Sequence, residues 1–546
     1  MPTIRIRFAL AAALFSLLLL PVAPAGACTS IMVTKGASAD GSTMVTYAAD
    51  SHDIYGELYF LAGKRFGAGA MREIIEWDSG RHLGRIPQPA VTYTRIGNMN
   101  EHQVAISETT FGGRRELSGA NGILDYGSLI YIALERAKTA REAIQVMTSL
   151  ATEHGYASSG ESFSIADAKE VWLLEMIGKG KEQKGVVWVA RRVPEGMISA
   201  HANHARIRTF PLRDPDTLYA TDVISFARER GFFDGPDAEF SFADVYAPLD
   251  FGSVRFCESR VWSAFRRAAP SLDLPVEMAD GRHPEARLPL WVKPDRKLSV
   301  ADVMELMRDH FEGTPLDMTQ DVGAGPFACP YRWRPMTWES DGATYVHERA
   351  ISTQQTGFSL VSQSRDWLPD PIGGILWFGV DDTYSTVYVP MYAGIRAVPP
   401  TFAEGVASLS EFSWDSAFWV FNWVANYAYS RYSDMIVDIR AVQRELEGQF
   451  FADQAAVEEK ALALHRQAPE LARDYLTAYS AAAGDGVTAR WRRLGEQLLV
   501  KYMDGNVKDE FGRPTHPRYP DDWYRRIVRE RGELLRVVPM TGESAP

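Results

Sequence analysis

The stretch that decides the fold is Cys28-Thr-Ser-Ile-Met-Val33, with Lys35-Gly-Ala-Ser-Ala-Asp-Gly41 and Ser42-Thr-Met-Val-Thr-Tyr47 after it. The outer two pieces are rich in β-branched residues, which is typical of strands. The middle piece has turn chemistry and ends in the hairpin signal Asp-Gly. We therefore predict an antiparallel hairpin whose first strand begins at Cys28. Because such pairing brings the start of one strand beside the end of the other, Asp50 is expected near Cys28.

The segment before this hairpin resembles an export leader. Arg5 and Arg7 supply a positive start, residues 8–22 are apolar, and Ala25-Gly26-Ala27 has the small-x-small pattern of a signal-peptidase site. Cleavage after Ala27 would make Cys28 the first residue of the mature protein. The apolar run is short for a membrane span of about 20 residues. The sequence thus predicts a protein exported to the periplasm or the extracellular space, with no stable membrane span.

Two other readings of the leader remain open. In the first, the leader is an uncleaved membrane anchor. In the second, it is the signal of a lipoprotein, and Cys28 carries lipid. Ala25 stands where a lipoprotein usually has leucine, three residues before the cysteine. Lipidation would block the α-amine and remove the chemistry described next.

A cysteine with a free α-amine carries a nucleophile and a base on one residue. A free thiol has a pKa of about 8.5 and an α-amine titrates at about 7.7–8.0, so the amine can accept the thiol proton near neutral pH. It can later return that proton to a leaving amine, directly or through one water. Cys28 is therefore the candidate nucleophile, and no distant histidine is required.

Composition bounds the remaining possibilities. The chain has 546 residues, of which 46% are hydrophobic and 23% charged, as in a globular protein. Its net charge of −12 gives no support to nucleic-acid binding, which needs a basic surface. The other two cysteines, Cys257 and Cys329, pair in an oxidising compartment or stay as thiols, and the sequence does not decide between these.

The order of elements predicts an α+β fold in which antiparallel sheet is covered by helices. A helical segment is expected over residues 125–150 and long loops over 313–345. A helix is predicted after the cap residue Ser299, and residues 413–500 are predicted to be helical from a cap at Ser413. We divide the chain into a leader (1–27), a catalytic domain (28–404) and a mainly helical extension packed on it (405–546).

Several motifs in order resemble the cysteine dipeptidase family of N-terminal-nucleophile (Ntn) hydrolases. Besides the hairpin, they are Gly97-Asn-Met-Asn-Glu, Ser107-Glu-Thr-Thr-Phe-Gly-Gly, Asp125-Tyr-Gly-Ser-Leu, Gly160-Glu-Ser-Phe-Ser-Ile, Ala202-Asn-His-Ala-Arg-Ile and Ile351-Ser-Thr-Gln-Gln-Thr-Gly-Phe-Ser. The resemblance covers roughly residues 28 to 395. It implies a four-layer αββα sandwich and hydrolysis of dipeptides by Cys28 through a thioester.

The resemblance also implies roles for particular residues. Wider relatives, penicillin V acylase and bile salt hydrolase among them, place an aspartate near the nucleophile's amine and an asparagine in the oxyanion hole. Asp50 and Asn203 match these roles. Arg260 is the first candidate, and Arg255 the second, for the late active-site arginine of those relatives.

Three residues are expected to bind substrate: Tyr47, Glu108 and Thr109. The backbone around Glu108 and Thr109 is a candidate second oxyanion donor. Many dipeptidases have an arginine at the place of Tyr47, so the substrate carboxylate or the thiolate is expected to be handled differently here.

No metal or cofactor is predicted. His201 and His204 have a three-residue spacing, but no carboxylate accompanies them in the motif. The expected partners are small peptide substrates and, as a further possibility, other copies of the chain. Two alternatives stay open: an Ntn acylase of non-peptide amides, such as N-acyl lactones or bile salts, and a non-catalytic lipid-anchored binding protein.

Overall fold

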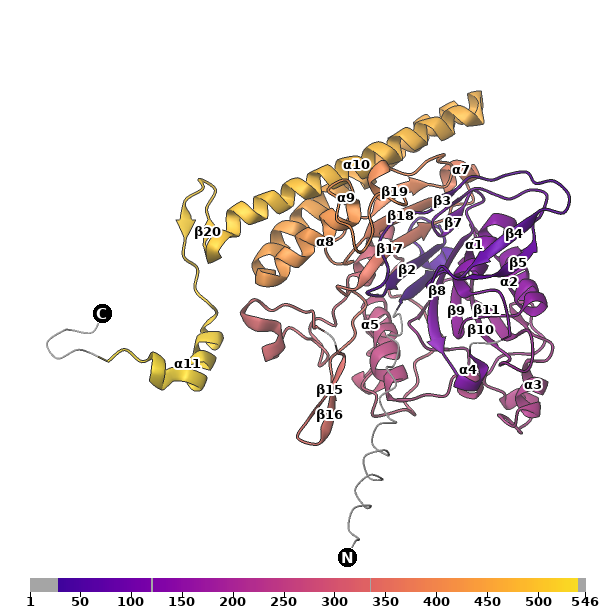
Figure 1. The fold of residues 1–546 in the computed structure, drawn as a ribbon, viewed down its shortest axis with the longest axis horizontal. Helices are drawn as coiled ribbons and strands as arrows, with labels where there is room; N and C mark the ends of the chain where they lie inside the picture. The colour runs from indigo at the N-terminus through magenta and orange to yellow at the C-terminus, as the bar shows by residue number, and fades with distance from the viewer. Residues whose placement is uncertain (1–27, 119–120, 334, 539–546) are drawn as a thin grey trace, which may run out of the picture.

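The computed structural model describes residues 28–118, 121–333 and 335–538 (Figure 1). The predicted leader and its cleavage site lie outside the described residues. Within the described part, no helix combines the length and apolarity needed to cross a membrane.

The predicted hairpin is present at the centre of the fold. Strand β1 (Ser30–Val33) pairs antiparallel with β2 (Met44–Asp50), with Met32 opposite Val45 and an outer bridge between Thr29 and Ala48. This register continues to Cys28 and places it next to the end of β2. The expected proximity of Cys28 and Asp50 follows directly from the pairing.

This hairpin belongs to a seven-stranded sheet whose neighbouring strands are all antiparallel. The order is β14-β12-β1-β2-β17-β18-β19, with β14 at Trp291–Val292, β12 at Ile198–His201, β17 at Thr356–Gln363, β18 at Ile375–Val380 and β19 at Val389–Tyr392. Its two central strands therefore come from the start of the chain.

A second antiparallel sheet packs against the first, through contacts of β1 and β2 with β8 and β9. Its order is β13-β11-β10-β9-β8-β7-β6-β3, with β13 at Thr217–Tyr219, β11 at Val186–Arg192, β10 at Val171–Gly178, β9 at Gly160–Ala166, β8 at Ala105–Gly112, β7 at Met99–Asn100, β6 at Arg95–Ile96 and β3 at Phe60–Leu61. Alternate residues of β10 enter different cores. Leu173 joins the core shared with the first sheet, whereas Trp172 and Leu174 join a core with helices. Both faces of this sheet are thus buried.

Helices cover the outer faces of both sheets. The segment predicted to be helical over 125–150 forms two helices, α1 (Tyr126–Arg136) and α2 (Ala140–His154), which pack on the eight-stranded sheet. α5 (Ser259–Ala268) and α6 (Val300–Met307) contact β12, β2 and β17 of the other sheet. Ser299 caps α6 as predicted, in a capping box with Asp302. The short helices are α3 (Val223–Glu229), α4 (Phe242–Tyr246) and α7 (Asp370–Gly373).

The C-terminal part is helical, as predicted. α8 (Ala417–Ala428), α9 (Tyr432–Gln467) and α10 (Pro469–Tyr502) contact β18 and β19 at the edge of the seven-stranded sheet. The predicted cap at Ser413 is wrong: Ser416 is the N-cap and accepts from the Trp419 backbone N–H. Beyond α10, the β20–β21 pair (Val507–Lys508, Pro514–Thr515) and α11 (Asp521–Leu535) extend away from the body in Figure 1.

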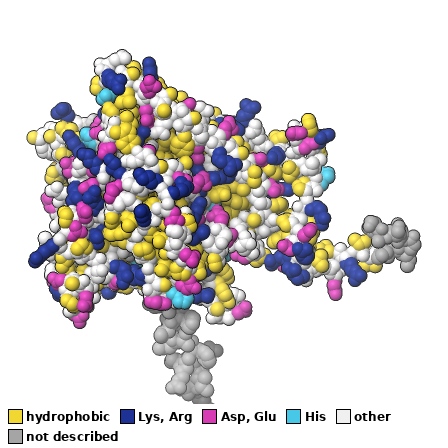
Figure 2. All heavy atoms as spheres, turned by 180° about the vertical axis from the view of Figure 1, so that it is seen from behind, with side chains coloured by type: hydrophobic (Ala, Val, Ile, Leu, Met, Phe, Trp, Pro, Cys, Tyr) yellow, Lys and Arg dark blue, Asp and Glu magenta, His cyan; other side chains and the backbone are white. Residues whose placement is uncertain are grey.

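Two further hairpins lie outside the sheets. β4 (Met71–Ile75) pairs with β5 (His82–Pro87), and β15 (Thr337–Ser340) pairs with β16 (Ala343–Val346). The second lies in the stretch expected to be only loops, where the Asp341-Gly342 turn joins two exposed strands. Basic and acidic side chains are interspersed on the surface that Figure 2 shows, so the net negative charge does not form one continuous field on that face.

Candidate active site

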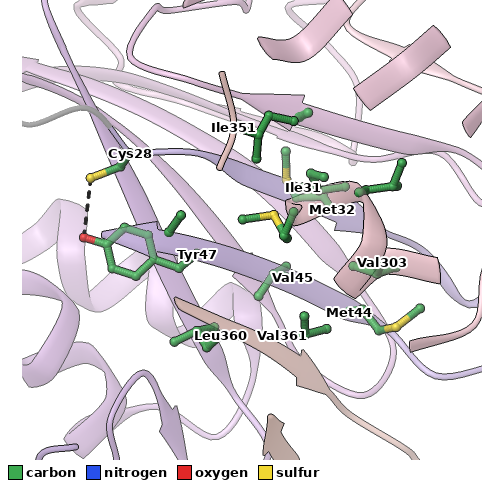
Figure 3. Packing of buried hydrophobic residues seen from close by; sticks show 14 of the residues in the cluster. Cys28, Ile31, Met32, Met44, Val45, Tyr47, Val303, Ile351, Leu360 and Val361 are labelled. Carbon is green, nitrogen blue, oxygen red and sulfur yellow. Dashed lines mark hydrogen bonds between the residues drawn. The ribbon is translucent and has the colours of Figure 1, made fainter. Parts of the chain in front are cut away.

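The described chain begins at Cys28, whose side chain is buried at the junction of the two sheets. Figure 3 shows its sulfur pointing toward the hydroxyl of Tyr47, with Ile31, Met32 and Val45 packed further along the hairpin. Cys28 precedes β1 and Tyr47 lies in β2. The apolar residues of the hairpin therefore fix the backbone that carries both polar side chains.

The thiol of Cys28 meets two oxygen atoms. Its sulfur lies 3.8 Å from the Tyr47 hydroxyl and 3.6 Å from Oε1 of Glu108. The Tyr47 hydroxyl also donates a hydrogen bond to that same Glu108 oxygen. The structure thus places Tyr47 and Glu108 next to the Cys28 thiol, while their assignment to substrate binding stays a prediction.

The electrostatics of this pocket keep the thiol protonated. Burial, and then the negative charges of Glu108 and Asp50, raise the pKa of Cys28 well above its ordinary value. Burial also raises the pKa of the Tyr47 hydroxyl, so it acts as a neutral donor. A base must therefore accept the Cys28 proton before the sulfur can attack.

Asp50 is completely buried and both of its carboxylate oxygens are engaged. Arg349 Nη2 donates to Oδ2 at 2.7 Å, and the Thr356 hydroxyl donates to Oδ1 at 2.6 Å. Burial nevertheless raises the pKa of Asp50, while Arg349 acts in the opposite direction. Sequence reasoning missed Arg349 because nothing local marks an ion pair between positions 299 residues apart.

Arg260 reaches the active site from α5, just after a π-helical turn (Ser253–Glu258). Its Nη1 donates to the Cys28 carbonyl and to the Thr29 hydroxyl. Its Nη2 donates to Oδ1 of Asn203 at 2.9 Å. By contrast, Arg255 pairs with Glu348 and bonds to the Asp280 carbonyl, away from Cys28.

These bonds fix the amide of Asn203. Because Arg260 donates to Oδ1, the amide oxygen and nitrogen are distinguished, and Nδ2 donates to the Thr110 carbonyl at 2.8 Å. Asn203 lies two residues after the end of β12 and has a φ of 63°, a left-handed conformation that asparagine adopts more readily than most residues. The backbone of Asn203 is thus strained at the position where its side-chain amide is held by Arg260 and Thr110.

The two expected β8 residues differ in orientation. The Thr109 hydroxyl bonds to Nδ1 of His201 at 2.7 Å, inside the sheet contact. Since successive backbone groups of a strand point to opposite edges, Thr109 N–H points toward β9 and the N–H groups of Glu108 and Thr110 point toward Asn203. The expected second donor is therefore better sought at Glu108 or Thr110 than at Thr109.

A cavity of about 750 Å³ opens beside Cys28. Its described lining contains five acidic side chains and no lysine or arginine. Aromatic rings form much of the remaining wall. The lining residues are Cys28, Tyr47, Ser51, Asp53, Ile54, Tyr55, Tyr59, Glu76, Trp77, Asp78, Glu108, Thr110, Tyr126, Ser158, Ser159 and Glu161.

Glu108 and Glu161 form a buried acidic pair in this cavity. Burial raises the pKa of both, and repulsion from Glu108 adds to the rise at Glu161. Oε1 of Glu161 accepts from the Thr110 hydroxyl at 2.7 Å. The two carboxyl groups can share a proton between them, and no other described residue donates to Oε2 of either glutamate. Two such oxygens side by side favour a cationic or strongly donating ligand.

His201 and His204, the two histidines of the motif, are buried in the protein interior. Nε2 of His201 bonds to the Ser164 hydroxyl at 2.7 Å, and burial lowers the pKa of His201 to about 3 and that of His204 to about 4. Across the described residues, no group of three or more His, Cys, Asp or Glu side chains is arranged to hold a metal ion. All three cysteines are free thiols.

Comparisons with known proteins agree with the resemblance seen in the sequence. A family model described as "Peptidase family C69" matches residues 65–445. A probable dipeptidase of Latilactobacillus sakei is 27% identical over 400 residues, covering 69% of this chain and 76% of that protein. A probable dipeptidase of Salmonella dublin is 26% identical over 418 residues, covering 72% and 86%. A dipeptidase of Bifidobacterium longum is 24% identical over 420 residues, covering 68% and 72%.

These matches confirm the predicted resemblance to the cysteine dipeptidase family. They also confirm the prediction of a hydrolase of that class. The family model begins at residue 65, so it does not bear on Cys28.

Proposed function

The chain belongs to peptidase family C69, and from this premise we propose that it is an exported dipeptidase whose nucleophile is Cys28. In this proposal, residues 1–27 direct export, and their removal exposes the α-amine of Cys28. The two packed sheets with helices outside them are then the four layers of an Ntn-hydrolase sandwich. The single observation that carries the proposal is the burial of Cys28 at the end of an acidic cavity of about 750 Å³.

The acidic wall suits the amino end of a dipeptide. A free dipeptide carries an α-ammonium group on its first residue and a carboxylate on its second. The α-ammonium of the substrate would lie against Glu108, whose Oε1 is 3.6 Å from the Cys28 sulfur. The carbonyl carbon of the substrate's first residue would then lie next to that sulfur. A carboxylate would be repelled from the same wall, so the second residue points away from it.

The proposed reaction begins with proton transfer from the Cys28 thiol to its own α-amine. The thiolate attacks the carbonyl carbon, and the oxyanion receives hydrogen bonds from Asn203 and a β8 backbone N–H. The ammonium of Cys28 next protonates the leaving nitrogen, so the second amino acid departs and a thioester remains. Water attacks the thioester, the amine accepts its proton, and the first amino acid leaves as the thiol is restored.

Buried polar groups position these parts. Arg260 joins the Cys28 carbonyl to the amide of Asn203, and so couples the nucleophile to the oxyanion donor. Asp50 lies beside Cys28, where it can stabilise the charged amine, and Arg349 and Thr356 fix its carboxylate. Hydrogen bonding to a charged carboxylate of this kind is strong and directional.

The acylase alternative has less support. An apolar acyl chain entering this cavity would displace water from five acidic side chains without replacing their hydrogen bonds, which is unfavourable. Residues 313–345, considered as a possible wall of either pocket, are not among the lining residues. The lipid-anchored alternative depends on a modified Cys28, which the mass of the mature chain detects.

The test compares the mature wild-type chain with Cys28→Ala and Cys28→Ser on a panel of dipeptides. We expect loss of at least about 1,000-fold in kcat/KM in both variants, because the covalent step is removed. Cys329→Ser is the matched control: Cys329 is half-buried, free and absent from the cavity lining, and its replacement should leave hydrolysis unchanged. Undiminished hydrolysis by Cys28→Ala would refute the proposed nucleophile.

A further inference from the structure

The cavity holds more carboxyl groups than one substrate ammonium requires. Glu108 and Glu161 lie at the nucleophile, and three more carboxylates, those of Asp53, Glu76 and Asp78, complete the lining. Asp53 follows β2 and the other two follow β4, so separate segments of the chain supply them. None of these five has a lysine or arginine beside it in the cavity wall.

Some of these five carboxyl groups have local hydrogen-bonding partners, and others lack a basic partner. Glu76 bonds to Ser79 and Arg81 outside the lining. Asp78 accepts a hydrogen bond from the Tyr126 hydroxyl at 2.7 Å, which is a neutral partner. Burial and then repulsion from Asp125 and Glu76 raise the pKa of Asp78. Oε2 of Glu108 and Oε2 of Glu161 are buried in the same cavity, and apart from a proton shared within the pair no described residue donates to them, so a ligand donor can bind there.

Aromatic rings lie between these carboxylates. Trp77 contacts Tyr59 with ring centroids 4.9 Å apart, and Tyr55 and Tyr126 complete this part of the wall. Such rings pack well against the methylene groups of a long side chain, and their faces attract a cation. An apolar wall that ends in carboxylates matches a lysine, ornithine or arginine side chain.

We propose that this site selects dipeptides whose first residue is basic, with the substrate α-ammonium at Glu108 and Glu161 and the side-chain cation at Asp78 and its acidic neighbours. This inference rests on the proposed dipeptidase function and specifies its substrate class. The basic residue belongs on the acyl side, because the leaving residue carries the carboxylate that the acidic wall repels. A basic second residue would place its side chain outside this wall.

The experiment measures kcat/KM of the wild-type enzyme for four dipeptides that share alanine as the second residue. Their first residues are lysine, Nε-acetyl-lysine, norleucine and glutamate. We expect lysine to exceed norleucine by about tenfold or more, since one charged hydrogen bond is worth at least that factor. Acetyl-lysine should fall to the norleucine level, and glutamate should be lowest. In a further pair of dipeptides with alanine first, Ala-Lys should gain nothing over Ala-norleucine.

A variant locates the preference. Glu76→Gln with Asp78→Asn keeps the side-chain shapes and removes two charges, so the lysine-to-norleucine ratio should fall by about tenfold. Glu73→Gln is the control, because Glu73 lies on the same hairpin, bonds to His82 and is absent from the lining. Its ratio should match that of the wild type. The four-substrate comparison uses unmodified enzyme, so a folding defect in the double variant does not affect it.

The outcomes separate the two proposals. Cleavage of all neutral dipeptides with equal or lower rates for lysine would overturn the basic-residue inference and leave the dipeptidase function standing. A lysine preference that survives the double variant would overturn the assignment to Asp78 and Glu76. Failure to cleave any dipeptide would refute the proposed function, and the inference would fall with it.

Discussion

The two sides of Cys28 differ in how their charges are balanced. Behind it, Asp50 is paired with Arg349, and Arg260 has an acceptor at each end of its guanidinium. In front of it, Glu108 and Glu161 are buried together without a basic partner in the described cavity wall. The rear side is therefore a closed positioning frame, whereas the front side is left for a ligand to complete. Under the proposed function, the difference separates residues that position Cys28 from those that select its substrate.

The largest effect is expected at the rear ion pair. Asp50→Asn leaves the buried guanidinium of Arg349 without its counter-charge, which should lower the free energy of unfolding by about 3–5 kcal/mol and abolish activity. Thermal and denaturant unfolding measure this loss. The double variant Asp50→Asn, Arg349→Met removes both charges and should recover part of the stability without recovering activity. Unchanged unfolding of Asp50→Asn would show that the pair does not stabilise the rear frame.

The second effect concerns the link between Arg260 and Asn203. Arg260→Lys keeps the charge but loses the fork that orients the amide, so kcat should fall by about 100-fold with little change in KM. Asn203→Ala should cost a similar factor, and the double variant should be no slower than the worse single variant. Independent, multiplying losses would contradict the idea that Arg260 acts through Asn203.

The smallest effect lies on the front side. Tyr47→Phe removes the hydroxyl that donates to Glu108, and this bond lowers the pKa of Glu108 against the rise caused by burial. Without it, the pKa of Glu108 rises further, so Glu108 loses its charge at a higher pH as the solution is acidified. The acid limb of the kcat/KM profile should move upward, with about tenfold loss near pH 6 and less near pH 8. A parallel loss at every pH would mean that Tyr47 does not act through this carboxylate.

How much of the site the sequence predicts depends on how far apart along the chain the interacting residues lie. The hairpin pattern at residues 28–47 correctly places Asp50 beside Cys28, because register is a local property. The family resemblance singles out Asn203 and, through wider relatives, Arg260, and in the structure Arg260 bonds to both Cys28 and Asn203. Arg349 carries no comparable signal, since its partner lies on the opposite end of the catalytic region. The cavity charge is equally hidden, because Glu161 and Asp78 join Glu108 only after three separate segments pack together.

Local ambiguity explains the smaller errors. Ser413 and Ser416 are both suitable caps, and only packing of α8 chooses the second. At β8, alternation of the strand turns the Thr109 side chain to His201 and leaves Glu108 at the cavity. Sequence alone names the strand but not the edge to which each backbone group points.

The central claim is that the α-amine of Cys28 is the catalytic base, and one paired measurement tests it most directly. The mature protein is analysed by intact mass, and its kcat/KM is compared with that of a chain that retains a non-cleavable Ala27. We predict a mature mass that begins at unmodified Cys28, and at least about 1,000-fold lower activity when Ala27 blocks the amine. Equal activity with Ala27 retained would contradict the account and would transfer the role of base to Glu108. A diacylated Cys28 would contradict it in favour of the lipid-anchored protein.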